Sequence, residues 1–144
     1  MIWTLKIECI SGAYLTHQCV RIIEIDSGSS LIQLHDAIQD AVHFDRDHPF
    51  EFFAGRTHRN RQVVFNDTLD WEEAFKTYGQ LTLDQVYPLP ARFKLYYHFD
   101  FGDQWYFEIR KMRKKAVEPA PGVSYPRVIE KQGPDPEQYP TYDQ

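Results

Sequence analysis

Two loops of this 144-residue chain contain the side-chain types that metal-assisted hydrolysis requires. Histidine and aspartate gather in both: Asp45, Asp47 and His48 in one, and His98, Asp100 and Asp103 in the other. Imidazole and carboxylate ligands together suit zinc, manganese or iron, and hydrolysis needs one open coordination position. The loops would supply such a site if they converged at one end of a sheet. Their spacing matches no known metal motif, so we assign no catalytic residue and predict no cofactor, with a divalent metal as the alternative.

Ordinary loop chemistry is the competing explanation for the same residues. The aspartates would close turns and cap backbone amides, and His48 would pack on an aromatic ring. The tripeptide Asp100-Phe101-Gly102 is like the magnesium-binding triplet of protein kinases. However, the chain has no glycine-rich loop, strand lysine or catalytic-loop aspartate to accompany it. The tripeptide is therefore interpreted as a turn.

A second candidate site is basic. Two runs hold half of the sixteen Lys and Arg residues: Arg56, Arg59 and Arg61 beside His58, and Arg110, Lys111, Arg113, Lys114 and Lys115. If the runs adjoin, exposed Tyr96 and Tyr106 would add stacking platforms for single-stranded nucleic acid. The residues we assign to such a site are Arg56, Arg59, Arg61, Arg110, Arg113 and Lys114. The alternative is a solvated sheet edge whose lysines prevent aggregation.

His35 is a further candidate, because it lies on the flank of an apolar helical stripe. A histidine there can act as a ligand or as a general base. The alternative is a mostly buried histidine that bonds a backbone carbonyl or a nearby carboxylate.

These residues depend on an aromatic hairpin for their positions. Alternating apolar residues predict strands before and after the loop 100–104. The register that buries every large apolar side chain on one face pairs Phe99 with Trp105, Tyr97 with Phe107, and Leu95 with Ile109. Gly102 and the two loop aspartates favour a tight turn.

The rest of the chain predicts an α+β fold. Periodicity indicates strands over 3–9, 17–25, 49–54 and 62–65, helices over 31–43 and 68–78, and one helical turn over 82–85. Ser30 and Gln33 have the spacing of a capping box. We expect a mainly antiparallel or mixed sheet packed against one long and one shorter helix, with a β-grasp-like ββαβ start.

Composition indicates one domain over 1–118, followed by a proline-rich tail over 119–144 with little regular structure that packs on the same domain. The net charge of −5 argues against a dedicated duplex-binding protein. Cys9 and Cys19 are expected to be buried, reduced thiols of a cytoplasmic protein. Neither a signal peptide nor a membrane-spanning segment is recognisable.

Three ordered segments resemble the plasmid pRiA ORF-three-like family of bacterial, archaeal and mobile-element proteins. They are the helix and strand over 34–53, the hairpin over 99–105, and the tail segments over 125–130 and 133–140. Many family members carry Trp-Arg-Arg early in the second strand, where this chain has Cys19-Val20-Arg21. The resemblance covers residues 2 to 140 for the most part. It implies a fold, but the family has no established activity.

The combined interpretation is a non-enzymatic binding or interaction module, whose partner is an unknown protein or small ligand. Its expected surface is the end of the sheet near His48, Asp100 and Trp105, where a concave, partly apolar pocket would support binding. The candidate binding residues are His35, Asp47, His48, His98, Asp100, Asp103 and Trp105. The alternatives are a nucleic-acid-associated accessory of mobile elements and a metal-dependent hydrolase. The oligomeric state stays open.

Overall fold

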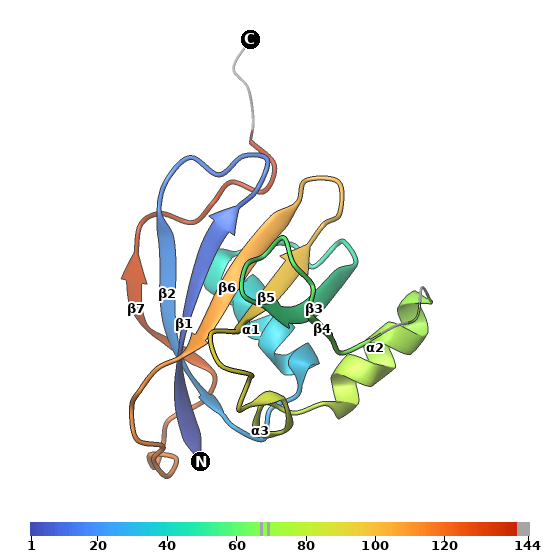
Figure 1. Cartoon of the computed structure of the whole chain (residues 1–144). Helices are drawn as coiled ribbons and strands as arrows, with labels where there is room; N and C mark the ends of the chain where they lie inside the picture. Colours follow the sequence, from blue (N-terminus) through green and yellow to red (C-terminus); the bar gives the residue numbers. More distant parts are fainter. Residues whose placement is uncertain (67, 69, 141–144) are drawn as a thin grey trace.

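Seven strands form a single antiparallel sheet in the computed structural model, which describes residues 1–66, 68 and 70–140. The strands are β1 (Ile2–Ser11), β2 (Cys19–Asp26), β3 (Phe50–Gly55), β4 (Val63–Val64), β5 (Lys94–Phe99), β6 (Trp105–Lys111) and β7 (Arg127–Gln132). The helices are α1 (Leu31–Val42), α2 (Trp71–Gln80) and α3 (Leu83–Val86). Helix α1 lies behind the sheet, and α2 lies beside it (Figure 1). Within the described residues, no helix has both the length and the apolar character to cross a membrane.

The strand order is β4-β3-β5-β6-β1-β2-β7. This arrangement bears out the α+β class and the ββαβ start. It does not confirm the β-grasp-like expectation. Every pairing in the sheet is antiparallel, and the β5–β6 hairpin lies between β3 and β1. The central position of the β5–β6 hairpin places the aromatic strands in the middle of the sheet.

The hairpin has the register that burial selects. Phe99 pairs with Trp105, Tyr97 with Phe107, and Leu95 with Ile109, as predicted. All six side chains are buried, each with at most 1% of its surface exposed. They form the centre of the core between the sheet and α1.

Local signals set the helix ends. Ser30 caps α1 in a reciprocal capping box with Gln33, and His43 ends the helix in a left-handed conformation. Asp70 caps α2 through the amides of Glu72 and Glu73. The expectation of one long and one shorter helix is not confirmed, because α1 has 12 residues, α2 has 10, and a third helix of 4 follows.

The expectation of a tail with little regular structure is wrong for Arg127–Gln132. This segment forms β7, which pairs with β2 and extends the sheet. Beyond it, Pro134 to Pro140 returns along the end of the sheet where β1 stops and β2 begins (Figure 1). The last part of the predicted tail, 141–144, lies outside the described residues.

Candidate functional site

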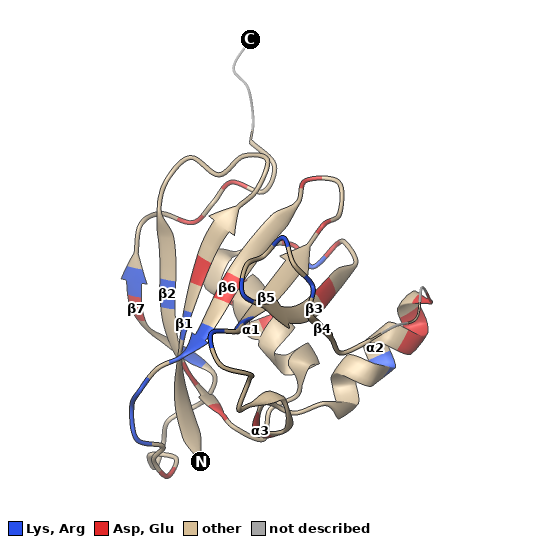
Figure 2. Cartoon of the chain, viewed as in Figure 1, with Lys and Arg blue, Asp and Glu red and all other residues tan. Residues whose placement is uncertain are grey.

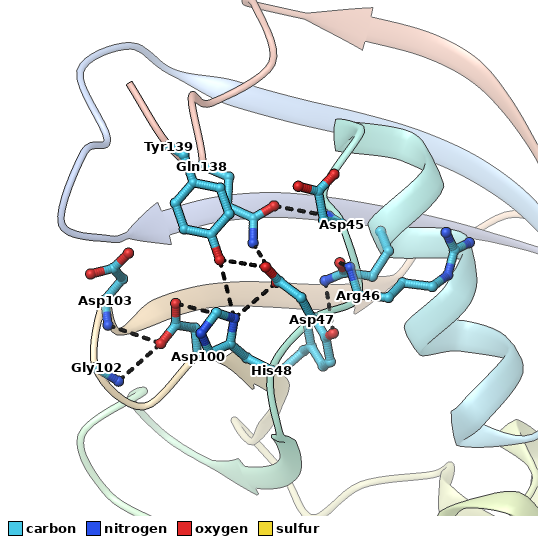
Figure 3. Close-up of polar contacts among 11 residues, drawn as sticks. Asp45, Arg46, Asp47, His48, Asp100, Gly102, Asp103, Gln138 and Tyr139 are labelled. Carbon is cyan, nitrogen blue, oxygen red and sulfur yellow. Dashed lines mark hydrogen bonds and ion pairs between the residues drawn. The ribbon is translucent and has the colours of Figure 1, made fainter. Parts of the chain in front are cut away.

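The two loops with histidine and aspartate converge in part. His48 Nδ1 lies 2.8 Å from Asp47 Oδ1 and 3.6 Å from Asp100 Oδ2 (Figure 3). Asp100 Oδ1 accepts hydrogen bonds from the amides of Gly102 and Asp103, at 3.1 and 3.2 Å. His48 also packs edge-on against the ring of Phe99. Turn closure and aromatic packing, the competing explanation from the sequence, therefore account for these side chains.

Charge within this cluster shifts two pKa values in opposite directions. The hydrogen bond with Asp47 raises the pKa of His48, and the nearby Asp100 carboxylate adds to the effect. Burial alone would raise the pKa of Asp47, but hydrogen bonds with Tyr139, His48 and Gln138 outweigh it and lower that pKa. The imidazole and the carboxylate stabilise each other in their charged forms.

His98 does not join the cluster. Its ring stacks on Tyr106 with centroids 4.1 Å apart, and its Nδ1 lies 3.7 Å from Glu51 Oε2. Asp103 contributes main-chain bonds, and Figure 3 shows its carboxylate turned away from His48. Among the described residues, no group of three or more His, Cys, Asp or Glu side chains is placed to hold a metal ion. The convergence that a metal-dependent hydrolase would require of these residues is therefore not found among the described side chains.

The tail closes the surface over this cluster. Gln138 donates to Asp47 Oδ1 at 2.9 Å and accepts from the Asp45 amide, and Tyr139 donates to Asp47 Oδ2. Trp105, expected near a binding surface, is fully buried and packs against Phe44. Its burial excludes direct contact with a ligand at this end of the sheet.

His35 is a buried core histidine. Its ring stacks on Phe50 with centroids 3.8 Å apart, and its Nδ1 shares a hydrogen bond with the Tyr97 hydroxyl. Burial lowers the pKa of His35 to about 4, which keeps the ring neutral near pH 7. Burial was anticipated from the sequence, but the hydroxyl partner was not. Because the ring is enclosed, His35 is not a ligand-contacting residue.

Arg21 is a buried cation that the site predictions did not include. Only 1% of its surface is exposed, and its guanidinium donates four hydrogen bonds, three to backbone carbonyls and one to Asp135. The bond to Asp135 holds the tail against β2. Arg21 is the arginine that this chain keeps where many family members carry Trp-Arg-Arg.

The two basic runs are partly neutralised. Arg61 pairs with Glu51, and its guanidinium lies over the Phe53 ring. Arg110 pairs with Glu108. Tyr96, expected to be an exposed stacking platform, is 2% exposed because Phe53, on the neighbouring strand β3, stacks on it. Arg56, Arg59, Arg113 and Lys114 remain exposed.

A cleft of about 620 Å³ lies at the end of the sheet where β1 and β5 begin and β6 stops. Its floor and walls come from three segments that are distant in the sequence: Trp3 on β1, the connection 87–93 with the first residue of β5, and Ile109 to Lys111 on β6. The volume lies within the range of small-molecule sites. Sequence reasoning missed this cleft because only the strand order brings the three segments together.

Aromatic and cationic side chains share the lining of this cleft, which we call the basal cleft. The aromatic members are Trp3, Tyr87 and Phe93, and the cationic members are Arg92, Lys94, Arg110 and Lys111. The lining includes no aspartate or glutamate among the described residues. Lys111 Nζ lies 4.7 Å from the Trp3 ring centroid, which holds the cation at the cleft wall.

Fold and cleft together define a small α+β protein with one antiparallel sheet and a cleft of ligand size. The chain belongs to the family of plasmid pRiA4b ORF-3-like proteins, whose family model matches residues 3–138. The resemblance seen in the three sequence segments is thereby confirmed.

A solved structure has the same fold. It is the crystal structure of MM3350, a protein of unknown function from Methanosarcina mazei Go1, with a TM-score of 0.66 and 19% identity over 93% of this chain and 70% of that chain. At this identity the likeness extends to the fold alone. No curated protein matches the chain significantly.

Proposed function

We propose that this protein is a non-enzymatic binding module that takes an anionic ligand with a planar or apolar body into the basal cleft. One observation carries the proposal: three aromatic and four cationic side chains line the same cleft, and no described lining residue is acidic. Apolar walls with a few charged groups are typical of ligand sites, in which the charged groups orient the ligand.

Two of the cations are available to a ligand. Glu108 neutralises Arg110 at 2.5 Å and approaches Lys94 at 3.9 Å. Within the described part of the chain, Arg92 and Lys111 form no ion pair with a carboxylate. Both are exposed at the cleft. An incoming anion would therefore meet positive charge that the fold does not already compensate.

The first test is to titrate the isotope-labelled protein with anilinonaphthalene sulfonate, an aromatic anion, and to follow the amide chemical shifts. We expect the largest shifts at Trp3, over 92–94 and over 109–111. Arg92→Asn removes one cation and keeps a residue type that tolerates the left-handed backbone found there, with φ at 68°. It should weaken binding roughly fivefold, because a solvated ion pair at about 4 Å contributes about 1 kcal/mol.

The matched control is Lys76→Asn, which removes an exposed cation from α2. It should leave the affinity unchanged. Trp71 and Phe75 form an exposed aromatic pair on the same helix, with ring centroids 5.9 Å apart. Shifts concentrated around that pair, or equal effects of Arg92→Asn and Lys76→Asn, would contradict the proposal.

A further inference from the structure

We infer that the ligand of the basal cleft is single-stranded nucleic acid, with a base against the aromatic wall and phosphates along the cations at the cleft and beyond it. The inference rests on the proposed function and specifies its ligand class. It depends on two features: the number of uncompensated cations next to the cleft, and the kind of side chain that forms its wall.

The cations extend past the cleft. Arg113, Lys114 and Lys115 follow Lys111 after Met112, and all three are exposed. Like Arg92 and Lys111, they form no ion pair with any carboxylate of the described residues. Figure 2 shows basic residues at the end of β6 and along the segment that follows it. A small anion would need one or two of these five cations, whereas a chain of phosphates would engage the series.

The wall favours a planar group between the charges. Trp3, Tyr87 and Phe93 are each partly exposed rather than sealed in the core. Aromatic side chains beside a basic track are the combination that binds single strands, since every base offers a face for stacking. A duplex keeps the faces of its bases stacked inside and offers only phosphates, sugars and base edges. The net charge of −5 adds a general repulsion that the local cations have to overcome.

The experiment measures fluorescence anisotropy of a labelled oligothymidylate of about ten nucleotides, a length within the range of single-strand sites. We expect binding whose affinity falls with salt, with a log–log slope between about −2 and −3.5 for three to five phosphate contacts. Inorganic polyphosphate and a DNA duplex of equal length serve as competitors. Both should compete more weakly than the unlabelled single strand, because neither offers a base to the aromatic wall.

Three variants locate the site. Arg92→Asn should reduce the magnitude of the salt slope by about 0.7, the value for one phosphate of a single strand. Phe93→Leu keeps an apolar side chain and should lower the affinity at least about fivefold through lost stacking. Lys76→Asn should change neither quantity. Because Arg92 is exposed and Phe93 only partly buried, both variants are expected to fold, which circular dichroism and thermal unfolding would verify.

The outcomes separate this inference from the proposed function. If anilinonaphthalene sulfonate shifts the cleft amides but the single strand does not bind, the protein is a small-ligand module and the inference is wrong. Equal competition by polyphosphate, together with no effect of Phe93→Leu, would show charge attraction alone and would also overturn it. Binding of the strand that Arg92→Asn leaves unchanged would place the nucleic acid elsewhere on the protein, and the inference would again be wrong.

Discussion

Arg21 Nη2 donates a hydrogen bond of 2.7 Å to Asp135 Oδ1, which joins β2 to the tail across 114 positions of the sequence. Every other hydrogen bond of the Arg21 guanidinium goes to a backbone carbonyl. Asp135 is therefore the only described carboxylate that compensates this buried cation. The same carboxylate accepts from His43 at 2.7 Å and lies 3.3 Å from Lys131.

Asp135→Asn should destabilise the protein by about 2 kcal/mol, because it leaves the Arg21 charge buried without its counterion. This expected destabilisation is smaller than for a fully buried ion pair, since the Asp135 side chain is 28% exposed. Urea unfolding at pH 7 would measure the loss. Glu137→Gln, which removes an exposed carboxylate two residues away, is the control and should have little effect. Equal unfolding midpoints for the two variants would contradict the role of the pair.

The same ion pair predicts how the difference in the free energy of unfolding between Asp135→Asn and the wild type depends on pH. Burial alone would raise the pKa of Asp135, but hydrogen bonds from Arg21, His43 and Lys131 outweigh it and lower the pKa. A lowered folded-state pKa gives stability that is present above the unfolded value of about 3.9 and is lost as the pH falls through the folded value. The difference in the free energy of unfolding between the wild type and Asp135→Asn should therefore become smaller below about pH 4.

Gly12→Ala should destabilise the protein by roughly 1–3 kcal/mol through overpacking. A methyl group at Gly12 would lie 2.1 Å from Cε3 of Trp105, whose ring is fully buried and cannot move aside. Gly79→Ala in α2 is the matched control, since its methyl group would lie at an ordinary contact distance of 3.8 Å from Ile32 of α1. That variant should gain roughly 0.5–1 kcal/mol from helix propensity. Thermal unfolding of both variants tests the pair, and a neutral Gly12→Ala would show that Trp105 packs elsewhere.

Elements with local signals were predictable from the sequence. The hairpin register followed from alternation, because slipping one residue would expose half of the large apolar side chains. The start of α1 followed from its capping box. Strand β7 carries no such signal: all six of its residues are exposed, and prolines precede and follow it in the sequence. Its pairing with β2 depends on contacts such as Arg21–Asp135. Local sequence patterns cannot predict this contact, because its two residues lie far apart in the chain.

The candidate site was less predictable for the same reason. Alternation placed Tyr96 on the outer face of the hairpin correctly, but it could not show that Phe53 of the next strand covers that face. The approach of His48 to Asp100 was named from the sequence as a requirement for a site, and the two residues do lie close together. The sequence did not predict that His98 would instead contact Arg61 and Glu51. The basal cleft required the strand order itself.

His35 and His48 should titrate on opposite sides of the ordinary histidine pKa of about 6.5. Burial lowers the pKa of His35 to about 4, and the hydrogen bond with Asp47 raises that of His48. Nuclear magnetic resonance of the imidazole protons against pH would measure both. Asp47→Asn should lower the His48 value and leave His35 unchanged. A His35 that titrates near 6.5 would mean that water reaches its ring.

Opposite shifts also imply opposite effects on stability. The lowered pKa of His35 makes its contribution present above about pH 6.5 and lost as the pH falls toward about 4. The raised pKa of His48 makes its contribution present below about pH 6.5 and lost as the pH rises through the folded value. Urea midpoints of His35→Gln, His48→Gln and the wild type, measured at pH values below and above about 6.5, would separate the two contributions.

Tyr87→Phe should leave stability unchanged or raise it by up to about 1 kcal/mol. The Tyr87 hydroxyl is buried beside the basal cleft and has no hydrogen-bond partner among the described residues, and burial raises its pKa. Removing it deletes an unsatisfied group without opening a cavity. Tyr97→Phe is the matched substitution, because that hydroxyl bonds both His35 and Gln39. It should cost about 1–3 kcal/mol by leaving two buried polar groups unpaired. If urea unfolding showed that Tyr87→Phe and Tyr97→Phe lose equal stability, the Tyr87 hydroxyl would have a hydrogen-bond partner, which would contradict this prediction.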